Sequence, residues 1–366
     1  MKITDVKVQC FRQSVPESWK VHFGQTVDIS LVTLTTDERI EGYSMGRAVG
    51  GAWGTVLAHE LISVAKRLVM DEDPLDREKI WQKLWKFVSR NRLTIFAMSC
   101  IDVALWDIAG KIANLPVYKL IGGLRDKVPA YASSGVHHSA EEYVEEALRC
   151  KERGYRAYKL HPPGNPEKDL EACRAVRKAL GDEMVLMLDP TGSYDHREAM
   201  WVGRRLEELN FYWYEEPIGD FEVNGYAELC RALDIPVLAG EVTPGSVQNT
   251  AELILRGATD ILRGDVYWKG GITGVMKMAH LAEAFGLKLE LHHAASPIMN
   301  WANLHALGAF KNGDYLEILV PEDNLDFGLK QYARIDPEGF VRLPPSPGLG
   351  VEMDWEFVRR QTIYQS

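Results

Sequence analysis

Residues 126–322 carry the pattern that most constrains the fold, because short apolar runs rich in strand-forming residues alternate there with segments of helical spacing. A strand followed by a helix, repeated along the chain, predicts a parallel sheet, and eight such units predict a closed (β/α)8-type barrel. The first intervening helix begins with a capping-box pattern at residues 139–142. The predicted strands span residues 128–132, 155–160, 184–188, 211–214, 236–239, 260–262, 287–291 and 315–319.

Residues 1–125 have a different rhythm that predicts an α+β domain. Alternating apolar residues near the N-terminus and at 29–34, with a return through Ile40 and Tyr43, predict antiparallel strands. Apolar residues at three-to-four spacing over 56–69 and 94–112 predict helices. We therefore expect an N-terminal domain at 1–125, a barrel at 126–322, and a C-terminal segment at 323–366 that folds back onto the N-terminal domain.

Composition excludes several classes of function. The chain has 366 residues, with 42 Lys and Arg against 52 Asp and Glu, so its formal net charge is -10. An acidic chain does not suit general binding of nucleic acid or of anionic membranes. No apolar run reaches the roughly 18 residues of a membrane-spanning helix, and no secretion signal is evident, which predicts a cytoplasmic protein. The scattered cysteines predict neither a disulfide framework nor a zinc site; they are Cys10, Cys100, Cys150, Cys173 and Cys230.

Ionisable residues follow successive predicted strands, and in such barrels the chemistry lies at the C-terminal ends of the strands. A single such residue is equally well explained as a functional group or as a polar residue that ends a strand by chance. Several in succession at the same phase are harder to explain that way, because each interval equals one strand-helix unit. The residues are Lys159 with His161, Asp189, Glu215 with Glu216, Glu241, Asp265, His292 with His293, and Glu317, and the intervals from Lys159 onward are 30, 26, 26, 24, 27 and 25 residues.

Three of these residues, Asp189, Glu215 and Glu241, predict a metal site. Neighbouring carboxylates repel one another, and a hard divalent cation relieves that repulsion; an all-oxygen donor set favours Mg²⁺ over Zn²⁺.

Bases stand on either side of this predicted site, with Lys159 and His161 on one flank and Asp265 and His292 on the other. An aspartate can orient a histidine and raise its basicity. Such bases are suited to removing the proton α to a metal-bound carboxylate, and we expect Lys159, and Glu317 if it is protonated, to act as auxiliary donors.

Two glycine-rich or polar stretches, at residues 14–24 and 46–54, are either mobile lids over a pocket or ordinary surface loops. As lids, their aromatic residues would stack on a substrate or hydrogen-bond to it, and Lys20 and Arg47 would pair with a second carboxylate. Lys269 is a further candidate, whereas Tyr267 and Trp268 are expected to pack. The candidate substrate-binding residues are Trp19, Lys20, His22, Arg47 and Trp53.

Several short motifs in order give the whole chain a resemblance to the enolase superfamily, and within it to the mandelate racemase subgroup. They are Ile-Asp-Val-Ala-Leu-Trp-Asp at 101–107, Gly-Lys at 110–111, Pro-Val-Tyr at 116–118, Leu-Ile-Gly-Gly at 120–123, Tyr-Glu-Glu-Pro at 214–217, Ala-Gly-Glu at 239–241 and Gly-Gly-Ile-Thr-Gly at 270–274.

The resemblance implies an α/β fold: a modified (β/α)7β TIM-type barrel under an α+β capping domain built from the N-terminal region and the C-terminal tail. It implies Mg²⁺ ligands at Asp189, Glu215 and Glu241, an Asp265–His292 dyad, and Glu317 as the acid at the barrel end. His293 is the competing candidate for the base, but His292 lies six residues after Gly286, as the family pattern expects. Relatives commonly form dimers or octamers, so a homo-oligomer is also implied.

One residue departs from the family pattern. The best-known members carry Lys-x-Lys where this chain has Lys159-Leu-His161. An imidazole can donate or accept a proton near neutral pH, so His161 is a second base, an acid for a leaving hydroxyl, or only a hydrogen-bond partner of the substrate.

The resemblance favours dehydration of an acid sugar to a 2-keto-3-deoxy acid. Racemisation or epimerisation of a 2-hydroxy acid or a related carboxylate is the alternative reaction. A non-catalytic scaffold that only binds a ligand is the alternative class of function. In each enzymatic case the partner is a small-molecule carboxylate.

Overall fold

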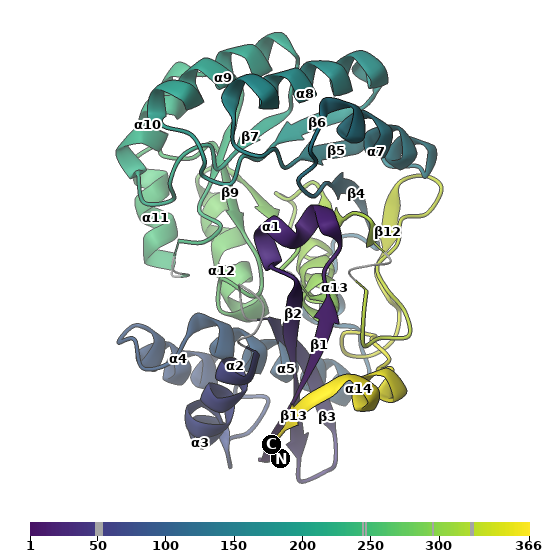
Figure 1. Ribbon diagram of the computed structural model, residues 1–366. Coiled ribbons are helices and arrows are strands. Elements are labelled where there is room, and N and C mark those ends of the chain that lie inside the picture. Colours follow the sequence, from purple (N-terminus) through teal and green to yellow (C-terminus); the bar gives the residue numbers. More distant parts are fainter. Residues whose placement is uncertain (48–53, 244, 246, 295, 323–325) are drawn as a thin grey trace.

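The computed structural model describes residues 1–47, 54–243, 245, 247–294, 296–322 and 326–366. Figure 1 shows a barrel surrounded by helices in one half and a separate sheet with its own helices in the other. Among the described residues, no helix is both long and apolar enough to cross a membrane.

A ring of eight parallel strands forms the barrel, and its neighbours pair in chain order. Strand β11 closes the ring by pairing in parallel with β4, where Leu316 lies opposite Ala130. All eight predicted strands are present, so the predicted fold class is confirmed. The strands are β4 (Lys127–Ser133), β5 (Ala157–Leu160), β6 (Val185–Leu188), β7 (Trp213–Glu215), β8 (Val237–Ala239), β9 (Ile261–Gly264), β10 (Lys288–Leu291) and β11 (Leu316–Leu319).

One α-helix follows each of the first seven barrel strands, which gives the (β/α)7β order. Several begin at side-chain caps: Asn165 accepts from Lys168 N, and Asp195 with Glu198 forms a complete capping box. The capping box predicted at 139–142 is only half formed, because the Glu142 carboxylate accepts from His138 N. The helices are α7 (Ala140–Glu152), α8 (Pro166–Leu180), α9 (His196–Glu208), α10 (Val223–Ala232), α11 (Val247–Leu255), α12 (Gly271–Ala284) and α13 (Pro297–Leu307).

The N-terminal region forms an antiparallel sheet of β1 (Ile3–Ser14), β2 (Thr26–Thr36) and β3 (Glu41–Arg47). Its connections include a 3-10 turn at Glu17–Trp19, which runs into α1 (Lys20–Phe23). The helix predicted at 56–69 is interrupted by a π-turn at Leu61–Ala65. The other helices of this region are α2 (Gly54–Glu60), α3 (Lys66–Val69), α4 (Arg77–Val88), α5 (Ile95–Ala113) and α6 (Val117–Ile121).

The C-terminal segment returns to both halves of the molecule. Strand β12 (Phe340–Arg342) pairs with β4 of the barrel. After α14 (Trp355–Gln361), strand β13 (Thr362–Gln365) pairs antiparallel with β1 at the edge of the N-terminal sheet (Figure 1). The tail therefore completes the cap, while the residue boundaries of the three segments stay a prediction.

Helix α5 of the cap packs on α12 of the barrel. The Asp102 carboxylate accepts hydrogen bonds from Thr273 N and Oγ1 at 3.0 and 2.6 Å. At the start of α12, Gly271 has a φ of +81°, and a Cβ there would lie 2.1 Å from Asp102 Oδ2. This close approach fixes the segment that follows β9.

An apolar layer fills the barrel below the ends of its strands. Side chains alternate along a strand, so residues two positions further on point into the same interior, one layer nearer the cap. The side chains at the ends of the strands therefore lie directly above a layer of buried apolar residues. The residues of this layer are Tyr131, Ala157, Met187, Trp213, Leu238 and Ile261.

Candidate active site

Lys159, at the end of β5, is fully buried and joins carboxylates from three other strands. Its Nζ lies 3.2 Å from Asp189 Oδ2, 3.0 Å from both oxygens of Glu215 and 3.0 Å from Glu317 Oε1. Three of the strand-end residues predicted from their spacing are thus brought together around one ammonium group.

Arg263, on β9, is a second buried cation in this cluster, and it was not among the predicted residues. Its Nε lies 2.7 Å from Glu215 Oε1 and 3.5 Å from Glu241 Oε2, and its Nη2 lies 2.8 Å from Glu317 Oε2. Arg263 lies on β9 two residues before Asp265, which directly follows the end of that strand, and the alternation of side chains points both inward. That alternation is the signal by which it is found.

The cluster holds more negative than positive charge. Four carboxylates, those of Asp189, Glu215, Glu241 and Glu317, face the two cations, which leaves two negative charges uncompensated. Burial alone would raise the pKa of Glu317, but the nearby Lys159 and Arg263 lower it well below the usual value. Glu317 is therefore an anion here and accepts hydrogen bonds from Arg263 and from His293 N, while its part in the reaction stays a prediction.

The donor chemistry of this cluster fits Mg²⁺. Asp189, Glu215 and Glu241 offer only carboxylate oxygens, and the surplus of two negative charges matches a divalent ion. Among the described residues, no three His, Cys, Asp or Glu side chains are grouped closely enough to enclose an ion as they stand. Lys159 and Arg263 hold these carboxylates, so the three must turn away from them to share a metal.

The His292 imidazole is paired with Asp265 across β10 and β9. His292 Nδ1 lies 2.6 Å from Asp265 Oδ2, while Asp265 Oδ1 accepts from Tyr267 N at 2.6 Å. The Nε2 atom is left facing Glu241 Oε1 at 3.5 Å. Burial lowers the pKa of His292, but Glu241 and Asp265 outweigh it and raise the pKa to about 9.

His293 has a different environment from its neighbour. Its backbone N–H donates to Glu317 Oε2 at 2.8 Å, and its Nδ1 is buried with no hydrogen-bond partner among the described residues. Burial lowers the pKa of His293 to about 3, so its ring is neutral. The structure thus pairs Asp265 with His292 rather than with His293.

His161 approaches the cluster from β5, on the side remote from His292. Its Nε2 lies 3.0 Å from Asp189 Oδ2, and its Nδ1 lies 2.7 Å from the carbonyl oxygen of Ser134. A carbonyl oxygen can only accept, so Nδ1 carries a proton and Nε2 is the atom available for proton transfer. Tyr143 Oη donates to His161 O at 2.7 Å and fixes the backbone.

Two of the predicted lid residues cover His161. The rings of Trp19 and His22 each lie 5.5 Å from the His161 ring. Trp19 Nε1 donates to Val320 O at 2.7 Å, which ties the short helical turn to the barrel. Burial lowers the pKa of His22 to about 4. This part of the cap therefore closes one side of the site.

The remaining lid residues are placed differently. The Lys20 ammonium pairs with Glu17 at 2.5 Å and is not brought to the carboxylates, because the four-residue helix turns it the other way. Arg47 is buried, and its Cζ lies 3.9 Å from the centre of the Phe23 ring. Trp53 lies outside the described residues.

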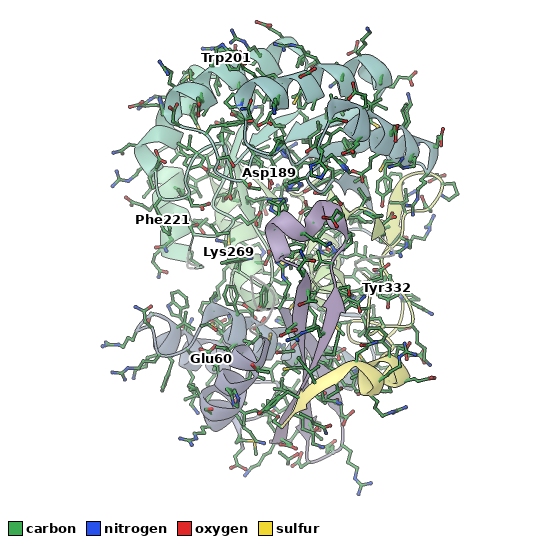
Figure 2. The ribbon with its side chains drawn as sticks, viewed as in Figure 1. Glu60, Asp189, Trp201, Phe221, Lys269 and Tyr332 are labelled. Carbon is green, nitrogen blue, oxygen red and sulfur yellow. The ribbon has the colours of Figure 1, made fainter. Side chains whose placement is uncertain are left out.

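Glu216 and Lys269 act on the backbone that carries Glu241. Glu216 Oε1 accepts from Gly240 N at 3.2 Å and from Glu241 N at 2.7 Å. Lys269 Nζ donates to Gly240 O at 2.5 Å and to Thr243 O at 2.6 Å. Asp189 and Lys269, both labelled in Figure 2, lie in the interior rather than at the surface. Tyr267 and Trp268 pack against Phe96, as expected.

Comparison with known proteins extends over most of the chain. Residues 3–122 match the N-terminal domain of the mandelate racemase / muconate lactonizing enzyme family, and residues 142–357 match the enolase C-terminal domain-like family. An arabinonate dehydratase from Saccharolobus solfataricus is 32% identical over 334 residues, which cover 88% of each chain. An L-talarate/galactarate dehydratase from Salmonella typhimurium is 36% identical over 283 residues, which cover 75% of this chain and 68% of the relative.

A solved structure is similar over the whole length. It is a D-glucarate dehydratase from Agrobacterium tumefaciens complexed with magnesium, 36% identical, with a TM-score of 0.90 and full coverage of both chains. Other relatives are named as cycloisomerases and racemases.

Proposed function

The chain belongs to the mandelate racemase / muconate lactonizing enzyme family of the enolase superfamily, and on that premise we propose that it is a Mg²⁺-dependent acid-sugar dehydratase. The relatives in this family are enzymes, mostly dehydratases together with racemases and cycloisomerases. The proposed reaction removes the proton from C2 of an acid sugar, expels the C3 hydroxyl as water, and gives a 2-keto-3-deoxy acid.

The observation that carries the proposal is a pair of imidazoles that face the carboxylate cluster from β5 and β10. Each has one ring nitrogen engaged, His161 Nδ1 by Ser134 O and His292 Nδ1 by Asp265. Each therefore presents Nε2 to the cluster. Two such groups at separate positions can remove a proton from one carbon and give a proton to a leaving oxygen on the next.

Each residue then has a defined part in the proposed reaction. Mg²⁺ held by Asp189, Glu215 and Glu241 would supply the Lewis acid that stabilises charge on the substrate carboxylate. In its neutral form, His292 takes the C2 proton at Nε2, and Asp265 stabilises the imidazolium that results. Lys159, as a fixed buried cation, stabilises the negative charge that develops on the substrate carboxylate.

His161 acts on the second half of the reaction. Before substrate binds, His161 Nε2 lies 3.0 Å from Asp189 Oδ2. In its protonated form His161 gives the Nε2 proton to the C3 oxygen as the C3–O bond breaks. Water leaves, a C2–C3 double bond forms, and the enol becomes the 2-keto acid. Protons balance, because His292 gains one and His161 loses one.

Epimerisation is the second candidate reaction, since two bases on separate strands can also remove a proton from one face and return it to the other. The relatives act on different kinds of acid sugar and do not identify one substrate for this chain. Arabinonate has one carboxylate, whereas galactarate and glucarate have two. We also infer a cytoplasmic enzyme that assembles as a homo-oligomer, a dimer or an octamer.

The test uses the full chain with Mg²⁺ in D2O and a set of acid sugars. We expect loss of the C2 proton signal together with formation of a 2-keto acid. Exchange or epimerisation without keto product would replace dehydration by the second candidate. Absence of both Mg²⁺ binding and exchange with every acid would leave only a ligand-binding scaffold.

A further inference from the structure

Arg47 ends β3 of the cap and is 6% exposed. Its guanidinium stacks on one face against Phe23, with Cζ 3.9 Å from the ring centre. Its backbone carbonyl accepts from Tyr267 Oη, which joins this position to the segment after β9. The ring contact positions the side chain, and the hydrogen bond positions the backbone, at the junction of cap and barrel.

The charge of Arg47 has no partner in the described part of the chain. No acidic side chain there forms an ion pair with it, and its buried Nε has no hydrogen-bond acceptor. Arg263, which is equally enclosed, is held by Glu215 and Glu317. Burying a charge without a partner is costly, so a buried, unpaired guanidinium points to an anion that is supplied from outside the chain.

The surroundings of Arg47 place that anion at the candidate active site, because the Phe23 ring on which it stacks lies 5.4 Å from the Trp19 ring, and the Trp19 ring lies 5.5 Å from the His161 ring. Burial lowers the pKa of Arg47 to about 10, and the site residues Asp265 and Glu241 oppose this shift. The positive charge of Arg47 in turn contributes to the lowered pKa values of His22 and His293. Arg47 is thus a cation at neutral pH, and it stands on the cap side of the bases.

We infer that Arg47 binds a second carboxylate, at the far end of a dicarboxylic acid sugar whose first carboxylate enters the reaction. The inference rests on the proposed function and makes its substrate class narrower. Lys159 and the predicted metal ligands come from the barrel and serve the reacting end. Arg47 and Phe23 come from the cap, and an aldonate, whose far end is an uncharged alcohol, would leave the guanidinium unpaired.

The experiment compares aldarates with aldonates of matched configuration: glucarate with gluconate, galactarate with galactonate, and mannarate with mannonate. For each acid, kcat/KM is measured with Mg²⁺, and a competitive inhibition constant is measured where the acid does not react. We expect the best aldarate to exceed its matched aldonate at least about 30-fold, as for a buried charge pair.

Substitutions then assign this preference to Arg47. Arg47→Gln should lower kcat/KM for the aldarate by a similar factor and leave the aldonate within about 3-fold, because only the far end loses its partner. Arg47→Lys should restore part of the loss, which a purely structural role would not predict. Arg67→Gln, which removes an exposed arginine from the same cap, is the matched control and should change neither acid.

Several outcomes overturn the inference. Equal activity of the wild-type protein on both acids of a pair excludes it, as does an equal loss on both in Arg47→Gln. A terminal phosphate shares the chemistry of an anion, and a preference for 6-phosphogluconate over glucarate would reassign the site to phosphate. Exchange with aldonates but not with aldarates defeats only this inference, whereas exchange with none of the acids defeats the proposed function itself.

Discussion

Arg263 Nε lies 2.7 Å from Glu215 Oε1, and the Nη2 of the same guanidinium lies 2.8 Å from Glu317 Oε2. A permanently charged side chain thus occupies the floor of the carboxylate cluster and touches one predicted metal ligand directly. Because the cluster still has two more negative than positive charges, Arg263 reduces the repulsion without abolishing the need for a divalent ion.

Replacing Arg263 with Gln should lower the unfolding free energy of the metal-free protein. The same substitution should raise the affinity of the protein for Mg²⁺. Removing one partner of a buried ion pair costs about 3–5 kcal/mol of unfolding free energy, and the more negative cluster should attract the ion more strongly. Thermal melts with and without Mg²⁺ measure the first effect, and calorimetric titration measures the second. Arg256→Gln, which breaks an exposed pair with Glu252, is the control. An unchanged Mg²⁺ affinity would show that Arg263 does not tune the site.

Asp265→Asn should slow removal of the C2 proton by about 10²–10⁴-fold, a usual range for a positioned base. Loss of the carboxylate also lets the pKa of His292 fall from about 9 toward its ordinary value, so the base limb of the pH–rate profile should move to lower pH. Solvent exchange of the C2 proton, followed against pH, measures both. Asp182→Asn, at an exposed site, should behave as wild type. A profile that keeps its shape would separate Asp265 from the action of His292.

His161→Asn should lower the rate of keto-acid formation at least about 100-fold. Exchange of the C2 proton by His292 should continue. The reason is that an amide fills the space but cannot deliver a proton to the departing hydroxyl. Proton NMR in D2O follows exchange, and a carbonyl assay follows product in the same sample. Loss of exchange as well would make His161 the base. Unaltered turnover, matched by the exposed His138→Asn control, would remove His161 from the chemistry.

The buried His305 should make the free energy of unfolding depend on pH. This buried histidine accepts from Tyr118 N at Nδ1 and contacts Leu349 O through Nε2, each at 3.1 Å, so it must stay neutral. Burial lowers its pKa to about 4, partly offset by the bond to Leu349. Because the folded pKa is below the unfolded one, its contribution is complete above about pH 6.5 and is lost as pH falls through 4, by about 3 kcal/mol.

Denaturant melts between pH 7 and 4 test this prediction. His305→Gln can keep both hydrogen bonds without titrating, so its unfolding free energy should fall less steeply with acid. The slope that remains is expected from His22 and His293, whose pKa values are lowered in the same direction. The exposed His280→Gln should retain the wild-type slope. Parallel slopes for His305→Gln and wild type would show that His305 is not a source of the acid sensitivity.

The barrel was predictable from sequence because each of its strands and helices is specified by a short local pattern of apolar residues. Each unit repeats a short apolar strand and a helix, and the chemistry follows the strand end, so Asp189, Glu215 and Glu241 were found from their spacing. Arg263 was missed because it lies within a strand, where an inward charge is tolerated only when distant residues pair with it. No local pattern reveals those partners.

The lid residues show a second limit. Trp19, Lys20 and His22 lie within four positions of one another, yet Trp19 and His22 meet His161 while Lys20 turns to Glu17. Which side of so short a helix faces inward is decided by its packing on the barrel rather than by periodicity. Composition therefore identified the segment but not the residue within it that pairs away from the site.

Strand β13 pairs with β1, so the sheet of the cap is assembled from segments made at the start and at the end of this sequence. During synthesis the whole barrel can leave the ribosome before residues 362–365 exist, and until then β1 keeps an unpaired edge. The sheet of the cap that carries Arg47 therefore gains this edge strand only after the barrel strands have been synthesised.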